Sequence, residues 1–148
     1  MSTTLPDTVA PTPTRAYRSA ATRTPRSRWA GRILTSLAVL FLAVDATGKF
    51  LAPKEAVEGT LALGWQLHDL PILGAIQLVC LALYLIPRTA PLGAVLWTGY
   101  LGGAIATHLR VDNLLLSHVL FPLYVAAFVW AGLYLRDDRV RALLRPAR

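Results

Sequence analysis

Four long apolar segments, separated by short polar or proline-containing stretches, dominate the pattern of the chain. They cover about residues 33–51, 70–86, 91–109 and 114–135. At about 1.5 Å of rise per residue, each segment as a helix reaches most of the way across a hydrocarbon core about 30 Å thick. The pattern therefore predicts an all-α protein, an integral membrane four-helix bundle.

The stretch between the first two spans predicts one further element. Residues 53–63 are expected to form a short extra helix that ends at Gly64. Trp65 follows this helix, and an aromatic residue at such a place is typical of an anchor at the membrane surface.

Turn and cap residues predict how the spans begin and bend. Asp69 is the expected N-cap of the second span, and Asp112 or Asn113 that of the fourth. Pro122 lies inside the fourth span and is expected to kink it, because proline removes a backbone donor from the helix interior.

Composition agrees with a membrane protein and indicates its orientation. The chain has 148 residues, which suggests one domain, and its 55% hydrophobic content argues against an ordinary soluble one. The net charge is +7, with six arginines before the first apolar run and five after the last. Basic residues gather on the cytoplasmic side of membrane spans, so both termini are expected in the cytoplasm. No recognition motif accompanies the charge, so nucleic acid is not an expected partner.

Composition and the apolar segments together divide the chain into three parts. Residues 1–28 are rich in Thr, Pro, Ala, Ser and Arg and are expected to be a disordered basic cytoplasmic tail. A signal peptide is the rival interpretation, but the apolar run that follows is too long and lacks a small-residue cleavage site. Residues 29–136 form the predicted membrane domain, and residues 137–148 a basic cytoplasmic C-terminal tail.

Cysteine and histidine give no sign of a metal or redox centre. Cys80 is the only cysteine, which rules out an intrachain disulfide, and its apolar neighbours predict a small buried residue. The three histidines lie near the outer ends of their spans without ligand spacing. We expect no metal site and no cofactor bound by motifs of this chain.

Asp45 and Lys49 are the most informative residues, because they lie four positions apart inside an apolar span. A charge there costs about 2.5–3.5 kcal/mol on insertion scales, so it usually faces a partner or a polar cavity. At this spacing the two side chains can pair along one helix face. Two roles stay open: an ion pair that fixes helix packing, or a group that binds a ligand or handles protons.

Other polar side chains fall at a similar depth on separate spans. Gln77, Tyr100 and Thr107 lie in the outer half of the second and third spans, and Tyr124 lies on the fourth. The inner half is nearly all aliphatic. The simplest cause of this asymmetry is a shared polar pocket that opens outward, and its expected ligand-binding residues are Asp45, Lys49, Gln77, Tyr100, Thr107 and Tyr124.

The third span also carries a row of small residues. Gly99 and Gly103 have the GxxxG spacing that permits close helix contact. The row is expected to pack inside the bundle, and a homo-oligomer seam is the alternative. His108 does not share the face of Gly99 and is therefore not expected in the pocket.

At these residues the chain resembles the DoxX-like family of small four-helix membrane proteins. The matching pieces are residues 45–50, 74–77, 83–89 and 98–108. Ala46 stands where a glycine is usual, and Gln77 stands where glutamate is frequent, which weakens any proton-transfer role at position 77. The resemblance implies a bacterial inner-membrane protein. Some relatives are subunits of thiosulfate:quinone oxidoreductases, and others are linked to membrane complexes that handle thiol and oxidative stress.

The leading functional hypothesis is a membrane subunit of a quinone-linked oxidoreductase, or of a thiol or oxidative-stress complex. It would bind a quinone or another small amphipathic molecule in the outer half of the bundle, and a soluble or membrane redox partner would supply electrons. The alternative is a non-catalytic scaffold in the lipid bilayer that recruits partners. A small transporter is less expected, because no broken-helix pair or inverted repeat is evident.

Overall fold

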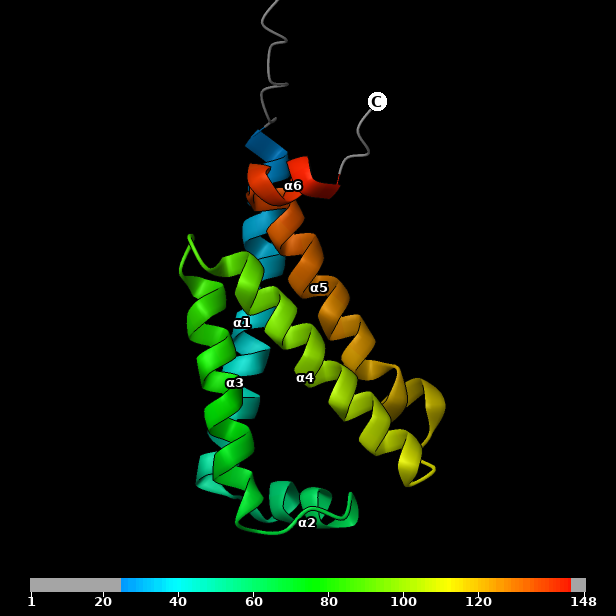
Figure 1. Ribbon diagram of the computed structural model, residues 1–148. Helices are drawn as coiled ribbons and strands as arrows, with labels where there is room; N and C mark the ends of the chain where they lie inside the picture. The colour runs from blue at the N-terminus through cyan, green and yellow to red at the C-terminus, as the bar shows by residue number, and fades with distance from the viewer. Residues whose placement is uncertain (1–24, 145–148) are drawn as a thin grey trace, which may run out of the picture.

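The computed structural model describes residues 25–144, and all regular secondary structure within that range is helical. The predicted all-α class is confirmed. Each predicted span coincides with a helix, and the fourth is divided in two (Figure 1). The elements in chain order are α1 (Pro25–Leu51), α2 (Lys54–Ala62), α3 (Asp69–Leu85), α4 (Ala90–Arg110), the π-helix η1 (Leu115–Val119), α5 (Phe121–Arg136) and α6 (Asp138–Leu144).

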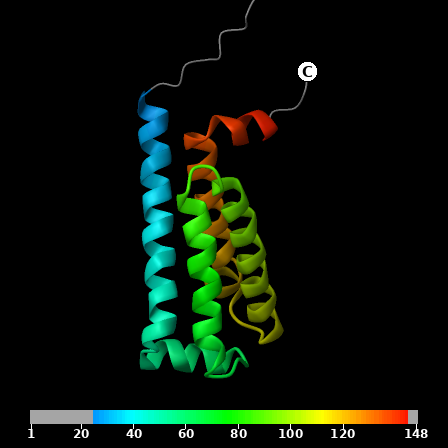
Figure 2. The same ribbon diagram turned by 60° about the vertical axis from the view of Figure 1, so that its left-hand side comes forward.

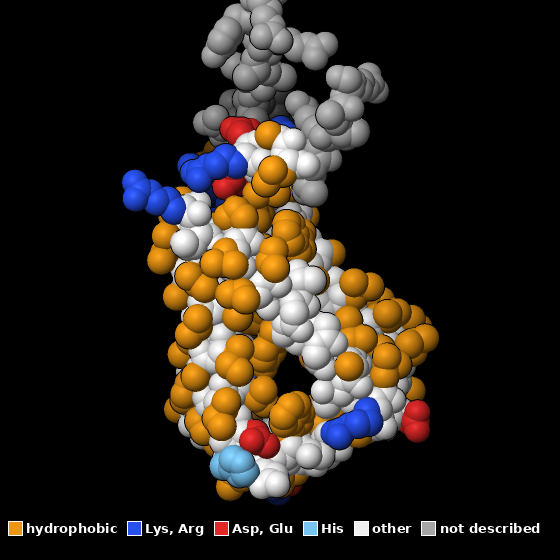
Figure 3. Space-filling model, in the orientation of Figure 1, with side chains coloured by type: hydrophobic (Ala, Val, Ile, Leu, Met, Phe, Trp, Pro, Cys, Tyr) orange, Lys and Arg blue, Asp and Glu red, His pale blue; other side chains and the backbone are white. Residues whose placement is uncertain are grey.

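Two segments are long and apolar enough to cross a membrane, Trp29–Leu51 and Leu115–Arg136, and α3 is a shorter apolar helix. The outer faces of the long helices carry large exposed apolar side chains, among them Leu40 on α1, Ile72 on α3, Val95 on α4 and Leu123 on α5. Figure 3 shows such side chains spread over the visible face. An apolar exterior of this kind suits a lipid environment.

The four long helices pack in a ring. α1 lies against α3 and α5, and α4 lies against the same two helices. The start of α1, the turn between α3 and α4, and the end of α5 meet at one end of the molecule, as the views in Figure 1 and Figure 2 agree. α2 lies across the opposite end, where α4 and α5 diverge from α3 (Figure 1).

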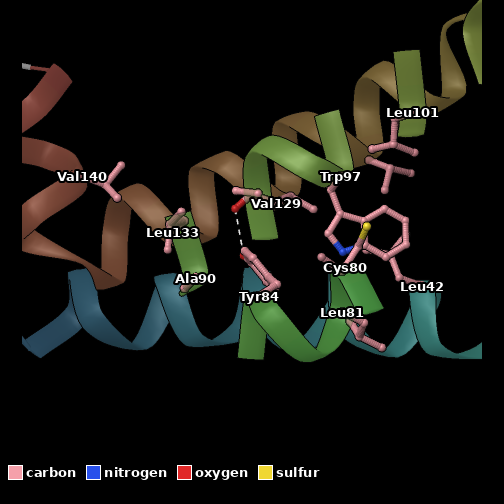
Figure 4. Packing of buried hydrophobic residues seen from close by; sticks show 13 residues of the cluster. Leu42, Cys80, Leu81, Tyr84, Ala90, Trp97, Leu101, Val129, Leu133 and Val140 are labelled. Atoms are coloured by element: carbon pink, nitrogen blue, oxygen red, sulfur yellow. Dashed lines mark hydrogen bonds between the residues drawn. The ribbon is translucent and has the colours of Figure 1, made fainter. Parts of the chain in front are cut away.

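Buried apolar side chains fill the space between the middle of the helices and the α3–α4 turn (Figure 4). Trp97 and Tyr84 are fully buried there, and Cys80 is buried as predicted (Figure 4). The Tyr84 hydroxyl donates a 2.9 Å hydrogen bond to the Val129 carbonyl, which ties α3 to α5. Arg136 donates to the Tyr84 carbonyl at 2.9 Å, and its guanidinium lies 4.7 Å from the centre of the Tyr84 ring.

Close helix contacts are made at glycines other than those expected. A Cβ atom built on Gly93 would lie 2.4 Å from the Tyr84 backbone nitrogen, and one on Gly132 would lie 2.6 Å from Thr35 Oγ1. A Cβ atom on Gly99 or Gly103 would meet nothing within 4 Å. The expected internal packing of this GxxxG pair is therefore wrong, because that spacing permits contact without requiring it. The homo-oligomer seam stays a prediction.

The short helix and its end follow the sequence pattern. α2 covers Lys54–Ala62, and Gly64 has a φ of +80°, a left-handed conformation that glycine adopts without strain. At the chain ends, the helices extend further than expected. α1 begins at Pro25, inside the segment assigned to the N-terminal tail, and α6 occupies most of the predicted C-terminal tail. The rest of the N-terminal tail, residues 1–24, lies outside the described residues.

The predicted caps and kink need correction. Asp69 is the first residue of α3, and its carboxylate accepts from the Gln66 N–H that precedes the helix. The N-cap of η1 is Leu114, so neither Asp112 nor Asn113 caps the fourth span. The helix of the fourth span is interrupted at Leu120, between η1 and α5. Pro122 therefore lies in the first turn of α5. Proline is tolerated there because first-turn N–H groups have no intrahelical acceptor.

The Gly93 contact gives a stability prediction. We expect Gly93→Ala to lower the free energy of unfolding by about 1–3 kcal/mol, because the new methyl group would force the α3 backbone away. Gly102→Ala, on the same helix with open space at its Cβ, should be neutral or stabilising by up to about 1 kcal/mol through helix propensity. Thermal unfolding of both variants in detergent measures the difference. Equal stability of the two variants would contradict the close contact between Gly93 and the α3 backbone.

Candidate ligand-binding cavity

A cavity of about 570 Å³ lies where α4 and α5 diverge from α1 and α3. Figure 3 shows the hollow between these helices, closed below by the crossing segment that contains α2. Most of its wall is apolar or aromatic. The lining residues include Phe41, Asp45, Lys49, Leu63, Trp65, Gln77, Gly99, Tyr100, Gly103, Thr107, His108 and Phe121.

A three-residue polar cluster forms one side of the cavity. Lys49 Nζ lies 2.6 Å from Asp45 Oδ2, one turn along α1. Gln77 Nε2 on α3 donates to the same oxygen at 2.5 Å. The carboxylate thus has two donors from two helices, which offsets much of the cost of placing it among apolar residues.

A glycine on α3 allows this cluster to form. A Cβ atom on Gly74 would lie 3.2 Å from Lys49 Cβ and 2.8 Å from the Phe50 ring. An alanine at this position would require the Phe50 ring to move and Lys49 Cβ to shift by a few tenths of an ångström. Gly74 comes one turn before Gln77, so the close approach of the two helices brings the amide within reach of Asp45.

α4 contributes one aromatic side chain and two glycines to the cavity wall. Tyr100 lines the cavity and packs edge-on against the buried Trp97 ring, at a centroid distance of 5.6 Å. Gly99 and Gly103 also line the cavity, and the absence of side chains at these positions enlarges it. Thr107 lies further along the wall, where its hydroxyl donates to the Gly103 carbonyl at 2.9 Å.

The segment after α2 closes the end of the cavity. Leu63 and Trp65 line it, and Arg110 at the end of α4 donates a 2.7 Å hydrogen bond to the Leu63 carbonyl. A Cβ atom on Gly64 would lie 3.0 Å from the Arg110 guanidinium. Gly64 therefore serves both the left-handed turn and the approach of Arg110, which joins α2 to α4 across the opening.

A second cavity of about 460 Å³ lies beside the first and shares Asp45 and Lys49 with it. It is lined by more polar side chains, including Glu55, Asn113 and His118. The ion pair therefore borders a mostly apolar space and a more polar one. His108 lines both cavities, and its Nδ1 lies 2.8 Å from Asn113 Nδ2. The rings of His108 and His118 lie 5.8 Å apart.

The structure brings together most of the residues singled out from the sequence. Asp45, Lys49, Gln77, Tyr100 and Thr107 line the first cavity, whereas Tyr124 does not and is 48% exposed on α5. His108 lines the cavity although it was not expected there. The face of Gly99 did not predict this, because His108 lies near the end of α4 and borders both cavities. The ligand-binding role of these residues stays a prediction.

Comparison with known proteins identifies the family. The model of the DoxX-like family matches residues 33–132, which include α3, α4, most of α1 and most of α5. The chain belongs to the DoxX-like family. Family membership and the two long apolar helices together indicate that this DoxX-like chain is a membrane protein. No curated protein and no solved structure shows significant similarity to it.

The cavity of this DoxX-like protein has one polar side, formed by Asp45, Lys49 and Gln77, and mostly apolar walls elsewhere. Among the described residues, no group of three or more His, Cys, Asp or Glu side chains could hold a metal ion. An ammonium group carries three donors, and Asp45 takes one from Lys49, so others remain for a bound molecule. Polar groups on one side and apolar walls elsewhere match a molecule with a polar head and an apolar body.

Proposed function

We propose that this DoxX-like protein binds a small amphipathic molecule of the quinone type in the cavity beside Asp45. It would act as a membrane subunit of an oxidoreductase or of a complex that handles thiol or oxidative stress. The observation that carries the proposal is the grouping of Asp45, Lys49 and Gln77 at one side of a cavity whose other walls are mostly apolar.

The size and lining of the cavity support a ligand with a ring. Its volume of about 570 Å³ falls within the range of about 300–1,000 Å³ usual for small-molecule sites. Phe41, Trp65 and Phe121 supply aromatic wall surface, and Lys49 and Tyr100 carry donors for a ligand oxygen. The sequence has no flavin, haem or iron–sulfur motif, so electrons would come from a partner subunit.

The proposal includes a setting in a bacterial inner membrane, which the chain crosses several times. Arginines cluster ahead of α1 and in its first two turns, up to Arg32, and again from Arg136 onward, so both termini would be cytoplasmic. The start of α1 and the end of α5 lie together (Figure 1), and the cavity lies towards the other end, beside α2 (Figure 3). With this orientation, the cavity would open towards the periplasm.

Reporter fusions test the orientation. Alkaline phosphatase, which is active only outside the cytoplasm, should be inactive when fused after Arg148 and active when inserted at Gln66 between α2 and α3. An active C-terminal fusion would reverse the proposed orientation. Equal activity at the two sites would contradict an odd number of crossings between them.

Binding of an added quinone to the purified protein tests the ligand. We expect Gly103→Leu to weaken binding at least about tenfold, because a leucine side chain would occupy the cavity and replace contacts worth more than about 1.4 kcal/mol. Gly102→Leu is the matched control, since Gly102 has open space at its Cβ but does not line the cavity. Fluorescence or calorimetric titration in mild detergent measures the affinities.

The polar side of the cavity is tested in the same assay. Asp45→Asn should weaken quinone binding, because the loss of the carboxylate releases Lys49 and Gln77 from their present positions. Protein that retains no quinone on purification, and binds it equally well with and without Asp45→Asn and Gly103→Leu, would remove the proposal.

A second candidate is a non-catalytic scaffold, favoured by the bond between Asp45 and Gln77, which joins α1 to α3. In that case the charges of this partly buried pair serve only helix packing, and apolar replacement of an ion pair withdrawn from water is often tolerated. Asp45→Asn alone would lower abundance, while Asp45→Leu combined with Lys49→Leu would restore it together with full function in cells. A well-folded double variant that has lost function would exclude the scaffold.

A further inference from the structure

The two cavities differ in the parts of the fold that form their walls. The first, of about 570 Å³, is lined mainly by residues of the long helices α1, α3, α4 and α5. The second, of about 460 Å³, is lined mainly by residues of α2 and of the segments that follow α2 and α4. Asp45 and Lys49 line both cavities, so this pair lies on the border between them.

The first cavity opens at the side of the bundle. Figure 3 shows an opening between α3 and α4, above the segment that contains α2. Gly99 and Gly103 line the cavity and are exposed, and the lining residues Phe41 and Phe121 are 43% and 44% exposed. Gly99 lies near the middle of α4, where a helix that crosses a membrane is surrounded by lipid tails. In the proposed membrane setting, this opening therefore faces lipid.

The second cavity opens at the end of the molecule that holds α2. Glu55 and Gly59 on α2 and His118 on η1 line it and are exposed. Val111 and Asn113, from the turn between α4 and η1, also line it. Turns of this kind lie outside the hydrocarbon region when they are not covered by protein, because their backbone groups need water or another partner. The second cavity therefore opens to water.

We propose that the first cavity fills from the lipid, through the opening between α3 and α4, and that the second fills from water. The ligand is then a molecule dissolved in the membrane, which enters from the side and brings its polar head to Asp45 and Lys49. The inference rests on the function and membrane setting proposed above, and it specifies the route of entry. The Asp45 side chain is 42% exposed and that of Lys49 16%, so a bound molecule can reach both. An apolar tail can remain in the opening, in contact with lipid.

Three glycines with open space at their Cβ positions allow a matched test of access. Gly48 on α1 lines the second cavity only, Gly103 lines the first only, and Gly102 lines neither. Each is replaced by cysteine in the full chain, which is placed in lipid nanodiscs and treated with a charged thiol reagent or an alkyl maleimide. Mass spectrometry gives the labelling rate at each position. Cys80 is buried, so slow labelling at Cys80 shows that a variant remains folded.

The two reagents should rank the positions differently. We expect the charged reagent to label Gly48→Cys at least about tenfold faster than Gly103→Cys, because a charge is costly to bring into a space filled by lipid. The alkyl maleimide should label Gly103→Cys and Gly102→Cys at similar rates, since lipid would reach both. Gly48→Cys is thus the reference for access from water, and Gly102→Cys the reference for access from lipid.

Either of two results would overturn this inference. In one, the charged reagent labels Gly48→Cys no faster than Gly103→Cys, so the two cavities do not differ in their access to water. In the other, the alkyl maleimide labels Gly103→Cys at least about tenfold more slowly than Gly102→Cys, so lipid does not enter the first cavity. Neither result bears on the quinone titrations, which test the proposed function separately. If rapid labelling at Cys80 shows that Gly103→Cys is unfolded, Gly99→Cys replaces it, because Gly99 also lines the first cavity and has open space at its Cβ.

Discussion

The carboxylate of Asp45, placed among apolar helix residues beside the cavity, needs hydrogen-bond donors, and these come from two helices. Asp45 meets that need with Lys49 on its own helix and Gln77 on the next. A single ion pair along α1 would compensate the charge but would not position any other helix. The bond to Gln77 does position one, because it is made only when α1 and α3 pack closely and at the right register. Gly74 is what permits that distance.

The helices are closely packed at one end of the molecule and separated at the other. Towards the α3–α4 turn, Gly93 and Gly132 bring neighbouring backbones together, and Tyr84 and Trp97 fill the space between the helices. Towards α2, the helices separate, and the space between them is only partly filled. A close-packed end can hold helix directions fixed while the other end keeps a cavity, since packed interiors transmit position well. The Asp45 cluster lies at the end with the cavity, and the closest backbone contacts lie at the other.

The sequence allowed good prediction of the elements and of most of the cluster, but not of the contacts between helices. Asp45 and Lys49 follow from helix periodicity alone, and Gln77 and Tyr100 follow from their similar depth on neighbouring spans. Tyr124 was placed by treating the fourth span as one continuous helix. The π-helix η1 and the break at Leu120 make that treatment invalid, because each changes which way the following residues face. A π-helix leaves no clear trace in the apolar pattern.

The glycines of α4 show why small residues alone could not identify the helix interface. Each helical glycine costs up to about 1 kcal/mol relative to alanine, so it needs a compensating reason. At Gly93 the reason is contact with the α3 backbone. At Gly99 and Gly103 no contact exists, and an alanine at either place would meet no neighbour within 4 Å. What these two positions share is the cavity that they line opposite the Asp45 cluster. Without side chains these two positions widen the cavity, whereas Gly102, which also meets no neighbour, lies outside it.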